Sequence, residues 1–193
     1  MSAEGRSGRA AGGQLEERLD LSHETNEKID QAKAMVQASP SNLSEALALL
    51  AALEKRCRVG NDNPSLVRVC ETSLVLCHES GDHEALVSTL KSLATRRSQK
   101  SQAVSKLVHT ALPWVLQTDE SGSVVGIGAP IEVSTDDERQ KREKLMVALR
   151  DITDGKLFLE AERARLTRGL AAIKVRISRS NFFGVHEPAI LKF

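Results

Sequence analysis

The sequence predicts an all-α fold in which antiparallel helix pairs stack as a TPR-like, right-handed α-solenoid. Leucines and other apolar residues recur at helical spacing through most of the 193 residues. Clusters of Gly, Pro, Asn and Asp separate these stripes at short intervals, which is typical of tight turns between neighbouring helices. Hydrophobic residues make up 40% of the chain and charged residues 27%, as in ordinary globular domains. A compact helical bundle is the alternative architecture.

The N-terminal part predicts a polar leader followed by two helices. We expect residues 1–22 to be a disordered leader. A helix is predicted over 25–38, and Pro40 ends it. Asn42 and Glu45 have the spacing of a capping box and predict the start of the next helix. The apolar stripe of that helix consists of Leu43, Leu47, Leu50, Leu53 and Cys57.

The middle of the chain predicts three more helices with sharp boundaries. The segment 60–64, Gly-Asn-Asp-Asn-Pro, ends one helix and starts the next. Gly81 suits the left-handed position after a helix, and Asp82 suits the cap of the following one. Residues 98–117 show a further apolar stripe, in which Pro113 is expected to kink or end the helix.

The C-terminal part predicts a loop and two final helices. Residues 118–134 contain three glycines and one proline, and we expect an exposed loop insertion with weak strand tendency. Thr135 and Glu138 form a second capping box at the start of the next helix. That helix is predicted to stop at Asp154-Gly155, and the last helix to run over 156–174.

These boundaries divide the chain into three regions. We expect the leader, 1–22, to precede a helical-repeat arm over 23–174, and 175–193, which shows no helical period, to be a poorly ordered tail. Because each repeat of a solenoid covers the next, we expect an uncovered apolar patch at the end of the arm. Its expected members are Leu170, Ile173, Ile177, Phe182 and Phe183.

Composition and charge argue against several classes of partner. Lys and Arg total 27 and Asp and Glu total 26, giving a formal charge of +1, unlike a strongly electrostatic nucleic-acid binder. Aromatic residues are 3% of the chain and include no Tyr, which disfavours base stacking. No apolar run approaches the length of a membrane span. We therefore expect no nucleic acid, membrane or small-molecule substrate.

The nearest approach to a metal cluster is formed by Cys70, Cys77, His78 and His83. Their spacings match neither a zinc finger nor a zincin. The two cysteines fall on the apolar stripe of a helix, where cysteine packs as a small hydrophobe. Core packing is the preferred interpretation, and a small metal-dependent enzyme is the remote alternative. We expect no catalytic residue, metal or cofactor.

A basic cluster is the clearest charged feature of the sequence. Arg96, Arg97 and Lys100 follow a predicted helix, with Lys106 beyond them. Positive charge suits the carbonyl end of a helix dipole, so a solvated helix end is one interpretation. The other is a docking patch for an acidic surface of a partner protein.

Two segments carry a resemblance to a known family. Leu93–Lys106, with LATRRSQKSQAVSK, and Asp154–Lys174, with DGKLFLEAERARLT followed by IK, resemble the 26S proteasome non-ATPase regulatory subunit 12 family. They match its KRRSQ…AV.K and EGK…E.ERARLT..LA.IK segments. Looser similarity reaches back to about Asn42. The resemblance stops at Lys174, before the PCI domain of that family, so we expect a truncated member.

The resemblance implies a non-catalytic scaffold in the lid of the proteasome regulatory particle. It implies protein–protein contacts with other lid and base subunits, in the cytoplasm and nucleus, during ubiquitin-dependent degradation. A paralogous PCI-type scaffold, signalosome-like, or a free helical-repeat adaptor is the alternative. The interaction candidates are the basic cluster and charges of the last helix: Arg96, Arg97, Lys100, Lys106, Glu160, Glu162, Arg163 and Arg165.

Overall fold

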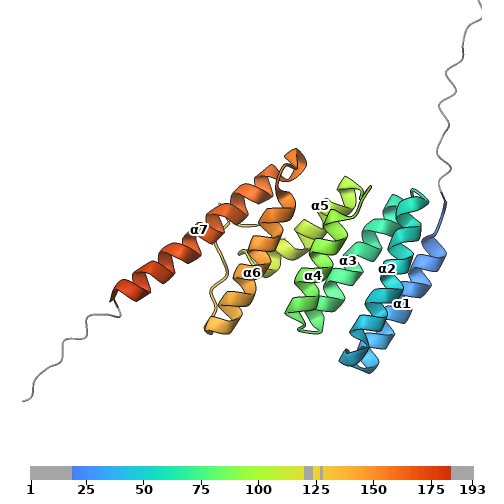
Figure 1. The fold of residues 1–193 in the computed structure, drawn as a ribbon, viewed down its shortest axis with the longest axis horizontal. Coiled ribbons are helices and arrows are strands. Elements are labelled where there is room, and N and C mark those ends of the chain that lie inside the picture. Colours follow the sequence, from blue (N-terminus) through green and yellow to red (C-terminus); the bar gives the residue numbers. More distant parts are fainter. Residues whose placement is uncertain (1–18, 120–123, 127, 184–193) are drawn as a thin grey trace, which may run out of the picture.

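The computed structural model describes residues 19–119, 124–126 and 128–183, with side chains through Val175. Within these described residues, seven α-helices follow one another in a row (Figure 1). They are α1 (Ser22–Ala38), α2 (Leu43–Val59), α3 (Asn63–Glu79), α4 (His83–Thr95), α5 (Ser101–Ala111), α6 (Asp136–Thr153) and α7 (Glu160–Phe183). Short 3₁₀ turns precede α2 (η1, Pro40–Asn42), follow α5 (η2, Leu112–Trp114) and precede α7 (η3, Leu157–Leu159). No described helix is both long and apolar enough to span a bilayer.

Helix packing follows the order of the chain. Each helix from α1 to α4 packs on the next, and α1 and α5 also pack on α3. The array then continues through α4 on α6 and α6 on α7. Among the described residues, the main packing contacts join helices that are near one another in sequence, which is the signature of stacked pairs. The predicted all-α solenoid is confirmed.

One apolar core runs through the whole array, from Ile29 in α1 to Ile173 in α7. Leu50, Leu74 and Leu90 are completely buried within it. Burying one such side chain contributes roughly 1.5–3 kcal/mol. The stripes identified in the sequence are therefore the seams along which the helices meet.

The helix boundaries confirm some predicted caps and correct one. Asp82 accepts a hydrogen bond from the Ala85 amide at 2.8 Å, and Gly81 before it has a φ of +73°. Thr135 caps α6 in the same way. The capping box at Asn42 is wrong, because η1 leads directly into α2 and leaves Asn42 at a ψ of 1°, outside the extended conformation of a cap. Its side chain instead donates to the Met35 carbonyl at 3.1 Å.

Part of the segment after α5 is more buried than predicted. Pro113 ends α5 at Ala111, as expected, by forming η2. The chain then folds back on itself, with the Gln117 amide donating to the Ala129 carbonyl at 2.8 Å. Gly128 is buried, with a φ of +85°, and a Cβ there would lie 2.9 Å from the Cβ of Arg165. Only Gly128 and Pro130 are buried among the described residues of 118–134, and the others are exposed or half-buried. The predicted exposed loop therefore holds except around Gly128, which packs against α7.

The last helix is longer than predicted. The expected end at Lys174 is wrong, because α7 continues to Phe183. Extending an existing helix costs far less than nucleating one, and the segment 175–183 contains neither Gly nor Pro. Leu170 and Ile173, expected in an exposed patch, are only 5% and 8% exposed because they pack into the core. The side chains of Ile177, Phe182 and Phe183, and most of the predicted leader and tail, lie outside the described residues.

Candidate interaction surface

The centre of the basic segment is a buried carboxylate in α2. Glu54 is completely buried and accepts hydrogen bonds from Arg58 Nε at 3.1 Å and Gln99 Nε2 at 3.1 Å. The guanidinium of Arg96 forms an ion pair with its second oxygen. A buried carboxylate is tolerated only when charged and polar donors surround it in this way.

The connection between α4 and α5 folds over α2 to supply these donors. The main chain takes a positive φ of 61° at Ser98, which turns Gln99 inward. Gln99 Nε2 also donates to the Leu93 carbonyl at 2.8 Å, and Arg58 Nη1 donates to the Arg97 carbonyl at 2.9 Å. We call this set of five residues, Glu54, Arg58, Arg96, Arg97 and Gln99, the Glu54 joint. The Glu54 joint links α2 to the connection between α4 and α5.

The predicted basic cluster is therefore divided by the fold. Arg96 points inward to Glu54, and Lys100 Nζ donates to Asn61 Oδ1 at 2.7 Å. Lys106 lies on α5 and pairs with Glu71 of α3 at 3.0 Å. The Arg97 side chain is exposed and forms no ion pair among the described residues.

The predicted residues of the last helix all lie in the first turns of α7. Glu162 is nearly buried and lies 3.1 Å from His109 Nε2 of α5 and 3.8 Å from Arg165 Nη1. Arg163 pairs with Asp154 at 2.7 Å, across the corner between α6 and α7. Glu160 is exposed and forms no ion pair among the described residues. The two predicted groups are thus separate, and each ties neighbouring helices together.

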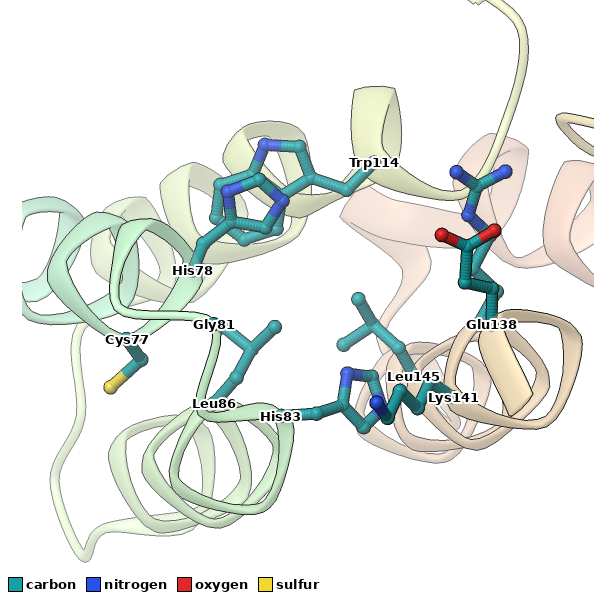
Figure 2. Close-up of a pocket in the computed structure, with 10 residues that line it drawn as sticks. Cys77, His78, Gly81, His83, Leu86, Trp114, Glu138, Lys141 and Leu145 are labelled. Atoms are coloured by element: carbon teal, nitrogen blue, oxygen red, sulfur yellow. The ribbon is translucent and has the colours of Figure 1, made fainter. Parts of the chain in front are cut away.

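A pocket of about 320 Å³ lies where the α3–α4 turn meets η2 and the start of α6. The imidazole of His78 stacks on the indole of Trp114, with ring centroids 4.0 Å apart and planes inclined by 13° (Figure 2). Partial burial lowers the pKa of His78 and of His83. The sequence analysis did not single out Trp114 or Arg142, which also lines the pocket.

The cysteines and histidines of the suggested metal cluster face different surroundings. Cys70 is completely buried, and burial raises the pKa of its thiol to about 12. The Cys77 thiol points away from the pocket (Figure 2) and donates to Thr89 Oγ1 at 3.6 Å. The predicted core packing of both cysteines is confirmed. Among the residues described by the structure, no three His, Cys, Asp or Glu side chains are arranged to hold a metal ion.

Comparison with known proteins supplies the family. A protein-family model described as PSMD12/CSN4, N-terminal, matches residues 45–180. The 26S proteasome non-ATPase regulatory subunit 12 of Dictyostelium discoideum is 34% identical over 137 residues, covering 71% of this chain and 27% of that protein. Homolog B of the same subunit from Arabidopsis thaliana is 30% identical over 121 residues, covering 63% and 23%. The 26S proteasome regulatory subunit rpn501 of Schizosaccharomyces pombe is 29% identical over 146 residues, covering 73% and 29%.

The matched region contains the structural features described above. It begins within α2, includes the Glu54 joint and the pocket beside Trp114, and ends within α7. This chain spans only 23% to 29% of the length of these three relatives. The resemblance carried by Leu93–Lys106 and Asp154–Lys174 is confirmed, and the chain belongs to the PSMD12/CSN4 N-terminal family.

Proposed function

We propose that this chain is a non-catalytic scaffold segment of the 26S proteasome regulatory-particle lid, acting through protein–protein contacts in ubiquitin-dependent protein degradation. The observation that carries the proposal is the family match over residues 45–180, which covers the stacked helical array from within α2 to within α7. The relatives named above are themselves called 26S proteasome regulatory subunits. In this proposal the partners are other lid and base subunits, and the protein works in the cytoplasm and nucleus.

The architecture supports a scaffold because the apolar faces of its helices are already buried against one another. The buried stripes hold the helices in one register, and the charged flanks remain at the surface. Charged groups at the rim of an interface mainly set its specificity and association rate. We propose that the arm, 23–174, docks at the two groups of predicted residues. Arg97 and Glu160 make the direct contacts, because neither has an ion-pair partner among the described side chains, and the other six hold the helices that present them. We also propose that residues 118–134 are an insertion in this arm and that residues 175–193 are a divergent tail.

A binding experiment with intact lid tests this function. The tagged full chain is mixed with purified lid and recovered on affinity resin, and the bound subunits are identified by mass spectrometry. We expect lid subunits with the wild-type chain and a clear loss with the double variant Arg97→Glu, Glu160→Arg. Lys33→Glu, a charge reversal on the exposed face of α1, is the matched control and should bind normally. Recovery of no lid subunit by the wild-type chain would contradict the proposal.

A signalosome-like scaffold is the second candidate, because the matching family model includes CSN4 in its description. The same recovery experiment with purified signalosome in place of lid separates the two. Stronger recovery of signalosome subunits would replace the proteasome assignment with the paralogous one. Recovery of neither complex would favour a free helical-repeat adaptor.

A further inference from the structure

The pocket beside Trp114 is built from three segments that are far apart in the sequence. His78 at the end of α3 and Trp114 in η2 form one wall, and Glu138 and Lys141 of α6 lie across the open space (Figure 2). Buried apolar side chains of α4 and α6 contribute to its lining, among them Leu86. The result is a hollow with an aromatic wall, an apolar base and a charged rim.

Two residues that line this hollow each have a buried polar atom with no hydrogen-bond partner among the described residues. These atoms are Nη1 of Arg142 and Nε2 of His83. An arginine is always charged, and a desolvated guanidinium N–H without an acceptor is unfavourable. The great majority of buried polar groups in proteins have a hydrogen-bond partner, and a ligand in the hollow would supply one here.

The charge of the lining selects an anionic ligand over a cationic one. Lys141 and Arg142 are positive and Glu138 is negative, and partial burial lowers the pKa of His83. Lys141 forms an ion pair with Asp137, whose carboxylate lies 2.7 Å away on the exposed side of α6. Of the two cations that line the pocket, Arg142 is the one without an ion pair among the described residues, and its guanidinium can meet a carboxylate in the bidentate geometry that arginine favours.

Size and lining then distinguish a side chain from a larger or a purely ionic ligand. A volume of about 320 Å³ is at the lower end of ligand pockets, roughly 300–1,000 Å³, and admits no helix. Inorganic phosphate would leave the apolar base and the Trp114 face unused. We propose that this pocket receives one acidic side chain, with its methylene groups on Leu86 and its carboxylate on Arg142, from an extended segment of a partner protein. The inference deepens the proposed scaffold function, and it rests on that function for the existence of a partner.

The pocket contains its own reporter, because Trp114 is the only tryptophan in the chain. The indole N–H signal of the full-length, ¹⁵N-labelled chain is followed by NMR during titration with a short capped peptide carrying one central glutamate. A peptide with glutamine in its place and inorganic phosphate are titrated in parallel. We expect a saturable shift with the glutamate peptide and an affinity at least about tenfold lower with the other two probes.

Variants of α6 assign the interaction to single groups. Arg142→Gln should lower the affinity for the glutamate peptide about tenfold. Glu138→Gln removes the opposing carboxylate and should raise that affinity about threefold. Arg139→Gln is the matched control, because Arg139 pairs with Asp136 on the same helix and does not line the pocket. Circular dichroism establishes that each variant is folded, and Glu138→Gln keeps the test valid should Arg142→Gln unfold.

Several outcomes would overturn the inference. They are equal shifts with the glutamate and glutamine peptides, phosphate binding as tight as the glutamate peptide, no shift at millimolar peptide, and normal binding by Arg142→Gln. Lid recovery separates this failure from that of the scaffold function. If peptides fail and wild type and Arg142→Gln recover lid equally, only the pocket inference falls. If the peptide binds as expected but wild type recovers no lid, the proposed lid function falls instead.

Discussion

Removing the carboxylate of Glu54 is the sharpest test of how this fold is held together. In Glu54→Ala, the guanidinium groups of Arg58 and Arg96 lose their shared partner. Breaking a fully buried ion pair costs about 3–5 kcal/mol, because one charge is left uncompensated. The two arginine side chains are 17% and 25% exposed, so they regain part of their hydration. We therefore expect a loss of about 2–4 kcal/mol in the free energy of unfolding.

The magnitude is measured by urea denaturation followed by circular dichroism, with Tm as a second readout. A loss of this size corresponds to a fall of about 5–15 °C in Tm for a chain of this length. Glu54→Gln keeps the shape and one acceptor, and should lose about 1–2 kcal/mol. Lys55→Ala, an exposed neighbour on α2, is the control and should stay within about 0.5 kcal/mol of wild type. A Glu54→Ala loss no larger than that of the control would refute the reasoning.

Three further predictions follow from backbone geometry, proton binding and burial. In Gly81→Ala the new Cβ meets open space, but the backbone φ of +73° is strained for alanine, so the free energy of unfolding should fall by about 1 kcal/mol. In Gly128→Ala the new Cβ would also lie 2.9 Å from Arg165, so the fall should be larger. Equal denaturation midpoints for the two variants would contradict this. Since the folded-state pKa values of His78 and His83 lie below 6.5, the unfolded chain binds more protons below that pH. Stability should hold steady above about pH 6.5 and fall below it, and the double variant His78→Gln, His83→Gln should flatten the curve; an unchanged slope would exclude these residues as its source. The thiol of Cys70, with its pKa raised to about 12, should react with a disulfide reagent only after urea unfolding, and rapid labelling of the native protein at Cys70 would contradict its burial.

Local sequence rules account for most of the fold. Helical periodicity locates the seams, and the Gly81–Asp82 turn adopts the expected left-handed glycine and capping aspartate. The errors arise where a neighbouring element decides the outcome. Asn42 has the composition of a cap but not its conformation, since η1 continues straight into α2. Helix α7 passes Lys174 because nothing in the following residues interrupts it.

The candidate sites were less predictable, because they depend on contacts between distant parts of the chain. Arg96 is identifiable as part of a basic run, but its partner Glu54 lies 42 residues earlier. One local signal was available. Glu54 directly follows Leu53 of the apolar stripe, so it lies on the buried side of α2, where a carboxylate needs charged or polar partners. The stacking of Trp114 on His78 has no comparable signal, since it depends on how η2 meets the end of α3.

The distribution of internal bonds also determines which charges are available for docking. For Arg96 to bind a partner, it would have to leave Glu54, and the cost of an uncompensated buried carboxylate would be subtracted from the binding energy. Arg97 offers its side chain without this loss, because only its carbonyl takes part in the Glu54 joint. Arg142 Nη1 has no hydrogen-bond partner among the described residues, so the proposed acidic side chain would supply one without breaking another bond. Recognition should therefore depend on Arg97 and Arg142, while Arg96 sets the relative position of the helices that present them.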